Sequence, residues 1–280
     1  MIVGVVGLGL IGGSMAKAIN QNTGNSVYGY DINPGICKKA VLVGAAEGVL
    51  TKDILRECDV VILGLYPDAV IDFVKSNLQN FKKDCIVMDT CGIKDYVCRT
   101  LFDLAEKNEF NFIGAHPMAG VEHMGFEYSK KALFDGASLI LVPPRGMSIS
   151  IVDRISKLMK SAGFSETPVV DAKTHDRIIA YTSQLAHVVS SAYIMSDTAF
   201  EHSGFSAGSY KDMTRVAKLN EDMWTELFLE NREFLANEID DFVNRLKKYS
   251  ESIRKGDEKN LHKMLADGRK RKLAIDKEIF

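Results

Sequence analysis

The chain has 280 residues, of which 46% are hydrophobic and 26% are charged. This composition is typical of a packed globular protein and excludes a disordered or fibrous chain, and the length suits one large domain or two ordinary ones. The 35 Lys and Arg nearly balance the 37 Asp and Glu, and the formal net charge of −2 gives no indication of a nucleic-acid partner.

Cysteine usage and the N-terminal segment favour a location in the reducing cytoplasm. The five cysteines are odd in number and form no C-x-x-C pair, so we expect neither a disulfide framework nor a metal site. The first residues, Met1–Val6, lack the basic start of a signal peptide. No apolar run approaches the roughly 18 residues that span a bilayer, so no membrane partner is expected.

In the first 170 residues, short apolar runs alternate with helical patterns. Such alternation predicts a parallel sheet with helices on both faces, which is a doubly wound α/β fold of the Rossmann type. The predicted strands are Ile2–Val6, Ser26–Tyr30, Val60–Leu65, Ile86–Asp89, Phe112–Ala115, Leu139–Val142 and Thr167–Val170. The predicted helices are Ile11–Asn20, Pro34–Val43, Asp68–Leu78 and Tyr96–Glu106.

The pattern becomes helical after Asp171, which places a domain boundary there. We expect an α/β domain over residues 1–171 and an all-helical domain over 172–280. One long helix is predicted over Ile178–Thr198, one or two more over Met223–Lys255, and a last one over Glu258–Ile279. Because Ile178–Thr198 is apolar around most of its circumference, we expect it to be buried, most completely in a homodimer.

A glycine motif between the first predicted strand and helix indicates a dinucleotide site. Gly7–Gly12 reads G-L-G-L-I-G, and Asp31 ends the next strand. The glycines permit a tight turn and close approach to a pyrophosphate, and the helix N-terminus offers unpaired N–H groups to it. We expect cofactor contacts from Gly7, Gly9, Leu10, Ile11, Gly12, Ser14 and Asp31.

Asp31 also bears on the choice of cofactor. Its carboxylate would accept hydrogen bonds from the ribose hydroxyls and would repel a 2′-phosphate. The next residues, Ile32 and Asn33, provide no arginine for such a phosphate. The sequence therefore favours NAD over NADP.

Two loops follow strands at the predicted carboxyl edge of the sheet, where a hydride-transfer substrate should lie. One is Asp89–Lys94, from which we expect Thr90 and Gly92 to contact the cofactor. The other begins with His116. A histidine there can take a proton from a substrate hydroxyl as hydride departs, so His116 is the candidate general base.

Four motifs together resemble prephenate dehydrogenases, in this order and at these distances. They are GLGLIGGS at Gly7–Ser14, HPMAG at His116–Gly120, KDMTRVA at Lys211–Ala217, and Trp224 followed by Leu229-Glu230-Asn231. The resemblance extends over both predicted domains. It implies a cytoplasmic NAD-dependent enzyme that converts prephenate to 4-hydroxyphenylpyruvate, CO₂ and NADH in tyrosine biosynthesis, with the helical domain serving dimerisation.

The same resemblance implies roles for single residues. His116 corresponds to the family's catalytic histidine, and Arg215 to the arginine that receives a substrate carboxylate. His187 resembles a histidine that lines the substrate pocket. Glu122 and Asp212 resemble polar residues that organise the entrance and Arg215.

Two positions depart from the family pattern. Gly92 stands where many members have a serine that bridges the histidine and the reacting hydroxyl, so Thr90, Cys91 or a water must substitute for it. Gln184 stands where many members have a histidine. Three alternatives to a prephenate dehydrogenase stay open, namely an arogenate dehydrogenase, a β-hydroxyacid dehydrogenase and a non-catalytic NAD-binding regulator.

Overall fold

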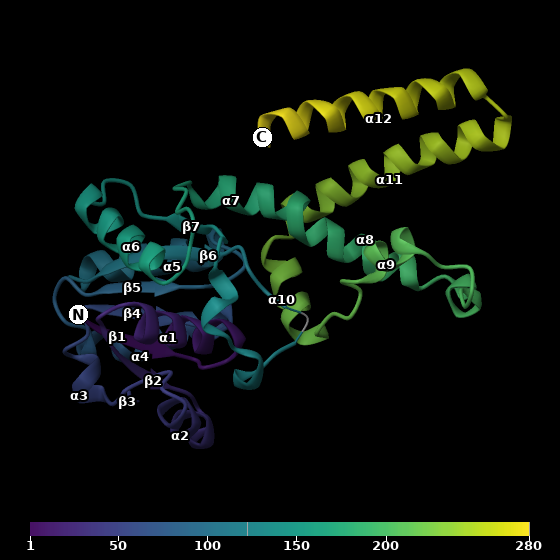
Figure 1. The fold of residues 1–280 in the computed structure, drawn as a ribbon. Helices are drawn as coiled ribbons and strands as arrows, with labels where there is room; N and C mark the ends of the chain where they lie inside the picture. The colour runs from purple at the N-terminus through teal and green to yellow at the C-terminus, as the bar shows by residue number, and fades with distance from the viewer. Residues whose placement is uncertain (122, 280) are drawn as a thin grey trace. The chain divides into compact units, whose positions relative to one another are not determined.

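The computed structural model describes residues 1–121 and 123–279 (Figure 1). By its internal contacts the chain forms two compact units, Met1–Asn231 and Arg232–Phe280. All strands of the described residues lie in the first unit and precede Asp171, so the change from mixed to helical structure occurs where the sequence pattern changes.

A seven-stranded sheet forms the centre of the first unit, in the order β3-β2-β1-β4-β5-β6-β7. The first six strands in this order are parallel, whereas β7 runs antiparallel to β6, which departs from the expected all-parallel sheet. The strand order reverses between β1 and β4, and in doubly wound folds ligands bind at the carboxyl ends of the strands at such a reversal. The strands are β1 (Ile2–Val6), β2 (Ser26–Tyr30), β3 (Gly48–Val49), β4 (Val60–Leu63), β5 (Ile86–Asp89), β6 (Asn111–Pro117) and β7 (Leu139–Val142).

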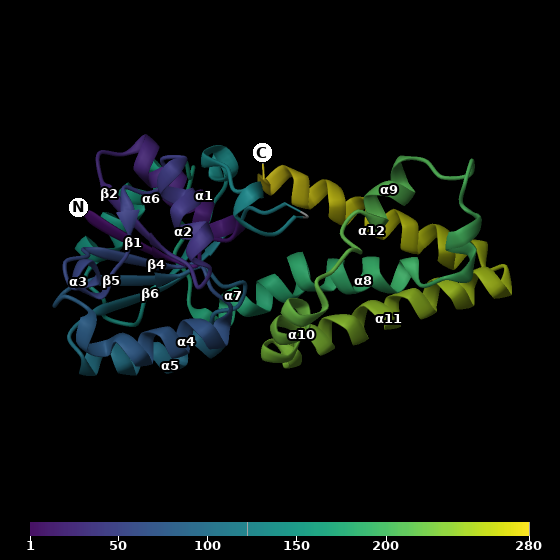
Figure 2. The ribbon, with the colours of Figure 1, turned by 90° about the horizontal axis from the view of Figure 1, so that it is seen from below.

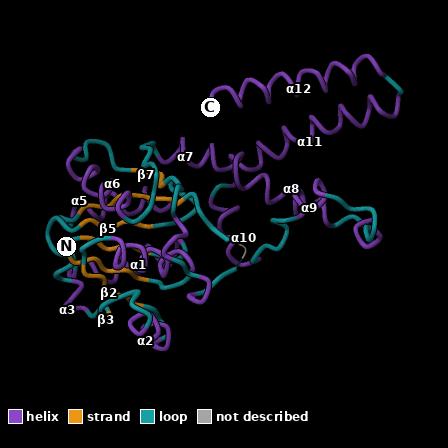
Figure 3. Tube along the Cα trace, viewed as in Figure 1, coloured by secondary structure: helices purple, strands orange, loops and turns teal. Residues whose placement is uncertain are grey.

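Helices cover both faces of this sheet, as Figures 2 and 3 show. Helices α4 and α5 lie along one face, and α1 and α6 lie along the other. The helices around the sheet are α1 (Leu10–Asn22), α2 (Pro34–Leu42), α3 (Lys52–Leu55), α4 (Pro67–Asn77), α5 (Asp95–Lys107) and α6 (Ile149–Ser161).

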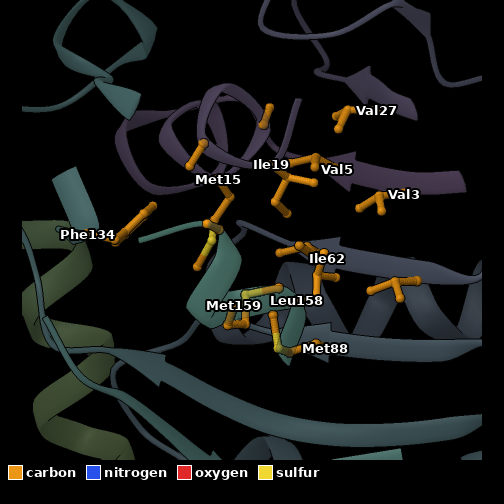
Figure 4. Packing of buried hydrophobic residues seen from close by; sticks show 14 of the residues in the cluster. Val3, Val5, Met15, Ile19, Val27, Ile62, Met88, Phe134, Leu158 and Met159 are labelled. Atoms are coloured by element: carbon orange, nitrogen blue, oxygen red, sulfur yellow. The ribbon is translucent and has the colours of Figure 1, made fainter. Parts of the chain in front are cut away.

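Two apolar clusters hold these layers together, one on each face of the sheet. Side chains of a strand alternate between faces, so Val3 and Val5 pack with α1 and α6, whereas Val6 packs with α4 and α5. Figure 4 shows Met15 from α1 and Met159 from α6 in the first cluster. This double-sided burial fixes the register of β1 and hence the position of the loop that follows it.

The predicted strand Thr167–Val170 is wrong. This segment makes only an isolated bridge between Val169 and Leu141, with the Val170 N–H donating to the Leu141 carbonyl at 3.0 Å. Pro168 has no N–H to donate, so a continuous ladder cannot form there.

The predicted single helix Ile178–Thr198 is also wrong in its bounds and its regularity. The helical segment begins earlier, as α7 (Ala172–Ile179), where the Asp171 side chain caps it by accepting from the Thr174 N–H at 3.0 Å. A π-helical turn, Ala180–Gln184, separates it from α8 (Leu185–Ile194). The first unit ends with the 3₁₀ turn Asp197–Glu201, α9 (Gly208–Thr214) and α10 (Glu221–Glu230).

The second unit is a pair of helices, α11 (Arg232–Lys255) and α12 (Glu258–Ile279). Gly256 adopts a left-handed φ of 63° in the turn, and Asp257 accepts a hydrogen bond from the Asn260 N–H at 3.0 Å. The bounds of α12 agree with the prediction, and Met223–Lys255 comprises two helices. No helix of the described residues is long and apolar enough to cross a membrane.

Candidate active site

The glycine loop between β1 and α1 has the shape that a dinucleotide requires. Gly7 has a φ of 80°, and a Cβ there would lie 2.4 Å from the Gly64 carbonyl oxygen. A Cβ at Gly12 would lie 1.8 Å from the Gly7 oxygen, so strand and helix pack too closely for any side chain. A Cβ at Gly9, by contrast, would meet nothing within 4 Å, which leaves the N-terminal end of α1 open to a ligand.

Asp31 lies just after β2, beside this loop. One of its carboxylate oxygens accepts from the Leu8 N–H at 2.9 Å, and the other accepts from the Asn33 N–H at 2.9 Å. The carboxylate is therefore held at the edge of the glycine loop, where a ribose would lie. Open backbone at Gly9 and a fixed acceptor at Asp31 together fit a dinucleotide.

Ser14 has another partner than the expected phosphate. Its side chain is fully buried, and its hydroxyl accepts from the Lys130 N–H at 2.9 Å. Next to it, a Cβ at Gly13 would lie 2.8 Å from the Phe126 ring. The Ser14 hydroxyl holds the Phe126–Lys130 segment against α1, and its expected contact with a phosphate stays a prediction.

At the carboxyl edge of the sheet, a buried ion pair joins the loop after β5 to β6. Lys94 and Asp89 are both fully buried and bonded to each other. The Lys94 ammonium also donates to the Ala115 carbonyl at 2.7 Å, and Asp89 accepts from the Ala115 N–H at 3.0 Å. Burial opposes the charge of Lys94, but Asp89 together with the neighbouring Cys91 and Cys98 outweighs burial, and the pKa of Lys94 is raised. These bonds fix the backbone immediately before His116.

His116, in β6, is the first member of a chain of three side chains. Its Nδ1 lies 2.9 Å from Nε2 of His175, and Nδ1 of His175 lies 2.6 Å from Oδ1 of Asp176. Burial lowers the pKa of His116 well below its usual range, and the nearby His175 and Lys94 lower it further. His116 is therefore neutral near pH 7 and available as a proton acceptor.

Sequence reasoning did not identify His175 as a functional residue. It lies on α7, far along the chain from the His116 loop, and a lone histidine followed by an aspartate carries no recognisable signal. The one sequence signal nearby is Asp171, a helix-capping residue. It predicts where α7 begins but not which residues the first turn of α7 contacts.

Gly92 lies beside His116, as expected for the position of the family's serine. A Cβ at Gly92 would be 3.9 Å from Cε1 of His116 and 3.6 Å from the Leu227 side chain. The two proposed side-chain substitutes are engaged elsewhere. The Thr90 hydroxyl donates to the Leu63 carbonyl at 3.1 Å, and the Cys91 thiol is directed to the Leu65 carbonyl at 3.5 Å. Both side chains therefore have backbone partners of their own on the neighbouring strand and loop.

The His187 ring packs against Trp224 at a tilt of 31°, with ring centroids 4.0 Å apart. Its Nδ1 lies 2.9 Å from the Ser183 carbonyl oxygen, which can only accept, so this nitrogen carries a proton. Burial lowers the pKa of His187, the bond to Ser183 opposes this, and the charge of Arg215 lowers it further. A neutral His187 consequently presents an acceptor, Nε2.

The remaining predicted substrate residues lie on or near α9. Arg215 caps the C-terminal end of α9 and is exposed, and Asp212 lies exposed on the same helix. Arg215 lies near the His187 ring, because its charge lowers the pKa of that histidine. Glu122 lies outside the described residues.

Gln184, the second departure from the family pattern, is buried in the π-helical turn. Its amide donates to the Leu227 carbonyl at 3.1 Å and accepts from Asn231 at 2.6 Å, while Asn231 also donates to the Asp176 carbonyl at 2.9 Å. These bonds tie α8 to the end of α10. Since α10 carries both Leu227, next to Gly92, and Trp224, on His187, it brings the two groups of site residues together.

A doubly wound sheet with a dinucleotide loop and a buried, neutral histidine at its carboxyl edge is the arrangement typical of nicotinamide-dependent dehydrogenases. Within the described residues, no cluster of three His, Cys, Asp or Glu side chains could hold a metal ion. Residues 15–165 match the family model of the prephenate dehydrogenase nucleotide-binding domain, and residues 171–267 match that of the prephenate dehydrogenase dimerization domain. The chain belongs to the prephenate dehydrogenase family, which confirms the resemblance of the four motifs.

Individual relatives agree with this assignment. The chain is 29% identical to a cyclohexadienyl dehydrogenase of Zymomonas mobilis over 98% of its length and 95% of the relative's. It is 26% identical to a prephenate dehydrogenase of Bacillus subtilis, over 92% of the chain and 71% of the relative. Among solved structures, prephenate dehydrogenase from A. aeolicus in complex with hydroxyphenyl propionate and NAD⁺ superimposes with a TM-score of 0.86 at 28% identity, covering 98% of both chains.

Proposed function

We propose that the chain converts prephenate and NAD to 4-hydroxyphenylpyruvate, CO₂ and NADH, on the route to tyrosine. The observation that carries this proposal is His116. His116 lies at the carboxyl edge of the sheet, and its pKa is lowered. Because its Nδ1 is hydrogen-bonded to His175, its Nε2 is the nitrogen that would accept a proton. A regulator that only binds NAD has no need of such a base.

The glycine loop and Asp31 would hold the cofactor, which when bound accepts the hydride that leaves the hydroxyl-bearing carbon of the ring. Nε2 of His116 takes the proton of the ring hydroxyl, so that a carbonyl forms at that carbon. This carbonyl is conjugated through the ring to the carbon that bears the carboxylate. It therefore accepts the electron pair released as CO₂ leaves, the ring becomes aromatic, and His116 returns the proton to the phenolate oxygen. A positioned base of this kind contributes roughly 10²–10⁴-fold in rate.

The charges around the proposed pocket favour prephenate, which carries two carboxylates and a keto group. Arg215 supplies a cation near His187. The segment Tyr181–Ser191 contains no Asp or Glu to receive an ammonium. Asp176, the nearest acid along the chain, is buried and bonded to His175, Lys94 and Asp95.

One observation favours arogenate as a second candidate. Arogenate has an ammonium in place of the keto group, and the neutral His187 presents a lone pair to the pocket. To donate to prephenate instead, His187 must take up a proton. Because the pKa of His187 is lowered, that uptake takes place only at acidic pH, so the preference for prephenate should decline as pH rises.

The deciding experiment compares kcat/KM for both substrates in the parent and in His187→Val, between about pH 6 and pH 9. We expect the parent to prefer prephenate, most strongly at low pH, and the variant to lose the part of that preference that grows as pH falls, because valine has no group to protonate. A parent that prefers arogenate at every pH, with this preference lost in His187→Val, would overturn the substrate proposal and leave the fold and the base unaffected.

We further propose that two chains form a homodimer through the helical region after Asp171. The match of residues 171–267 to a dimerization-domain model supports this, as does the exposure of apolar side chains in that region. Met195 is 78% exposed, and Phe200 and Phe205 are each 92% exposed. The change of family model between residues 165 and 171 also supports the proposed boundary near Asp171.

A further inference from the structure

We propose that Asp176 and His175 form a positioning relay that fixes the tautomer of His116 and so makes Nε2 its basic atom. This inference deepens the proposed function and rests on it. His175 and Asp176 are 1% and 2% exposed, so they act through His116 and not on the substrate. The two residues would orient the base without carrying its proton.

The Asp176 end of the relay is an acceptor. Its Oδ1 accepts from the Lys94 N–H at 2.8 Å and its Oδ2 from the Asp95 N–H at 2.8 Å, both at the start of α5. The positive end of a helix stabilises an ionised carboxylate. An ionised carboxylate can only accept, so Nδ1 of His175 must donate the bond to Oδ1.

The tautomer of His116 then follows by elimination. Burial lowers the pKa of His175 against the opposing effect of Asp176, so His175 is neutral near pH 7. A neutral imidazole with a proton on Nδ1 has a lone pair on Nε2, which accepts from Nδ1 of His116. A neutral His116 with its proton on Nδ1 has its lone pair on Nε2, the nitrogen left for the substrate.

The relay orients His116 and does not carry its proton away, because Asp176, at the far end of the relay, is enclosed by other groups. Asp176 is closed in by Lys94, Asp95 and, through its carbonyl, Asn231. An analogous carboxylate in serine proteases holds its histidine in the correct tautomer without becoming protonated.

The absence of a serine at Gly92 increases the importance of this relay. No hydroxyl at position 92 can hold the His116 ring from the substrate side. Within the described residues, the bond to His175 is the hydrogen bond that the ring makes. The orientation of the base in this chain is therefore assigned to His175.

Two variants of His175 separate positioning from simple structural support. In His175→Gln the amide oxygen can reach the place of Nε2 and accept from His116, whereas in His175→Asn the amide can reach the place of Nδ1 and donate to Asp176. We expect Asn to lower kcat roughly 10–100-fold with KM for prephenate nearly unchanged, as for other residues that orient a catalytic imidazole. We expect Gln to retain most of kcat. If His175 only supported Asp176 and α5, Asn would be the better replacement, and that order of activities would overturn the proposal.

A second measurement does not depend on turnover or on the His175 variants. In the ¹⁵N spectrum of the NAD-bound parent near pH 7.5, His116 should show a protonated Nδ1 and an unprotonated Nε2, with His116→Asn used to assign the signals. A proton on Nε2 would overturn the relay. If the spectrum shows the expected tautomer but prephenate is not oxidised, the relay stands and the proposed function fails.

Discussion

The burial of a single imidazole ring determines how the reaction should depend on pH. Burial first, and then the charges of His175 and Lys94, lower the pKa of His116 well below that of an ordinary histidine. Because a base loses activity only below its pKa, the loss of kcat/KM that protonation of His116 causes should appear only in buffer more acidic than the usual histidine range near 6.5.

Replacement of the same ring tests whether it is the base. We expect His116→Asn to lower kcat by roughly 100-fold or more, because the proton acceptor is removed. Prephenate should still bind, as measured by KM or by calorimetry. A nearly normal kcat would place the base on another residue.

Asp31 determines the expected choice between cofactors. Its carboxylate is held beside the glycine loop by the Leu8 and Asn33 N–H groups, where it would bind a ribose and repel a 2′-phosphate. We expect kcat/KM with NAD to exceed that with NADP, and Asp31→Ala to reduce the difference by weakening NAD binding and removing the repulsion. Equal or better use of NADP by the parent would refute the assignment.

At the scale of elements, the unit β1–loop–α1 offers a matched pair of glycine variants. In Gly12→Ala the new Cβ would meet the Gly7 oxygen at 1.8 Å, so strand and helix must separate. We expect a loss of stability of about 1–3 kcal/mol, which thermal unfolding would register as a clearly lower Tm. In Gly9→Ala nothing lies within 4 Å of the new Cβ, so Tm should stay near that of the parent while KM for NAD rises.

The two outcomes separate packing from cofactor contact in one element. An unchanged Tm in Gly12→Ala would contradict the close packing of α1 on the loop. An unchanged KM for NAD in Gly9→Ala would contradict the assignment of the open backbone at Gly9 to the cofactor.

The helical segment from α7 to α8 shows why its sequence pattern was misread. Its apolar periodicity continues through Ala180–Gln184, so the pattern gives no sign of the π-helical turn. The turn accompanies the burial of Gln184, which bonds to Leu227 and Asn231 on and after α10. An extra residue per turn is tolerated because tertiary hydrogen bonds are formed there, and π turns are frequent near functional sites.

At the scale of the whole molecule, exposed apolar side chains predict association. Ile178 and Tyr181 are 42% and 58% exposed, although the helix that carries them was expected to be buried. We expect a homodimer at micromolar concentration, which light scattering with size-exclusion chromatography would detect as a particle of twice the 31.0 kDa chain mass. A particle of single-chain mass at every concentration would refute the dimer.

The sequence by itself determined the parts of this protein that depend on local pattern. The first 31 residues contain β1, the glycine loop and Asp31. These can be recognised together because a phosphate-binding turn needs particular residues at particular spacings. His116 was identified for the same reason, since a histidine directly after a buried strand must lie at the edge of the sheet. The exact bounds of β2, β5, β7 and α12 also follow from short or regular patterns between clear turn residues.

Only the tertiary structure decided what surrounds these residues. His175, which Asp176 holds, contacts His116 from a helix 59 residues further along the chain. The partner of the Ser14 hydroxyl, the Lys130 N–H, lies 116 residues further along the chain. Hydrogen-bond partners of buried polar groups are set by which elements pack together, and a sequence read along the chain carries no record of that packing.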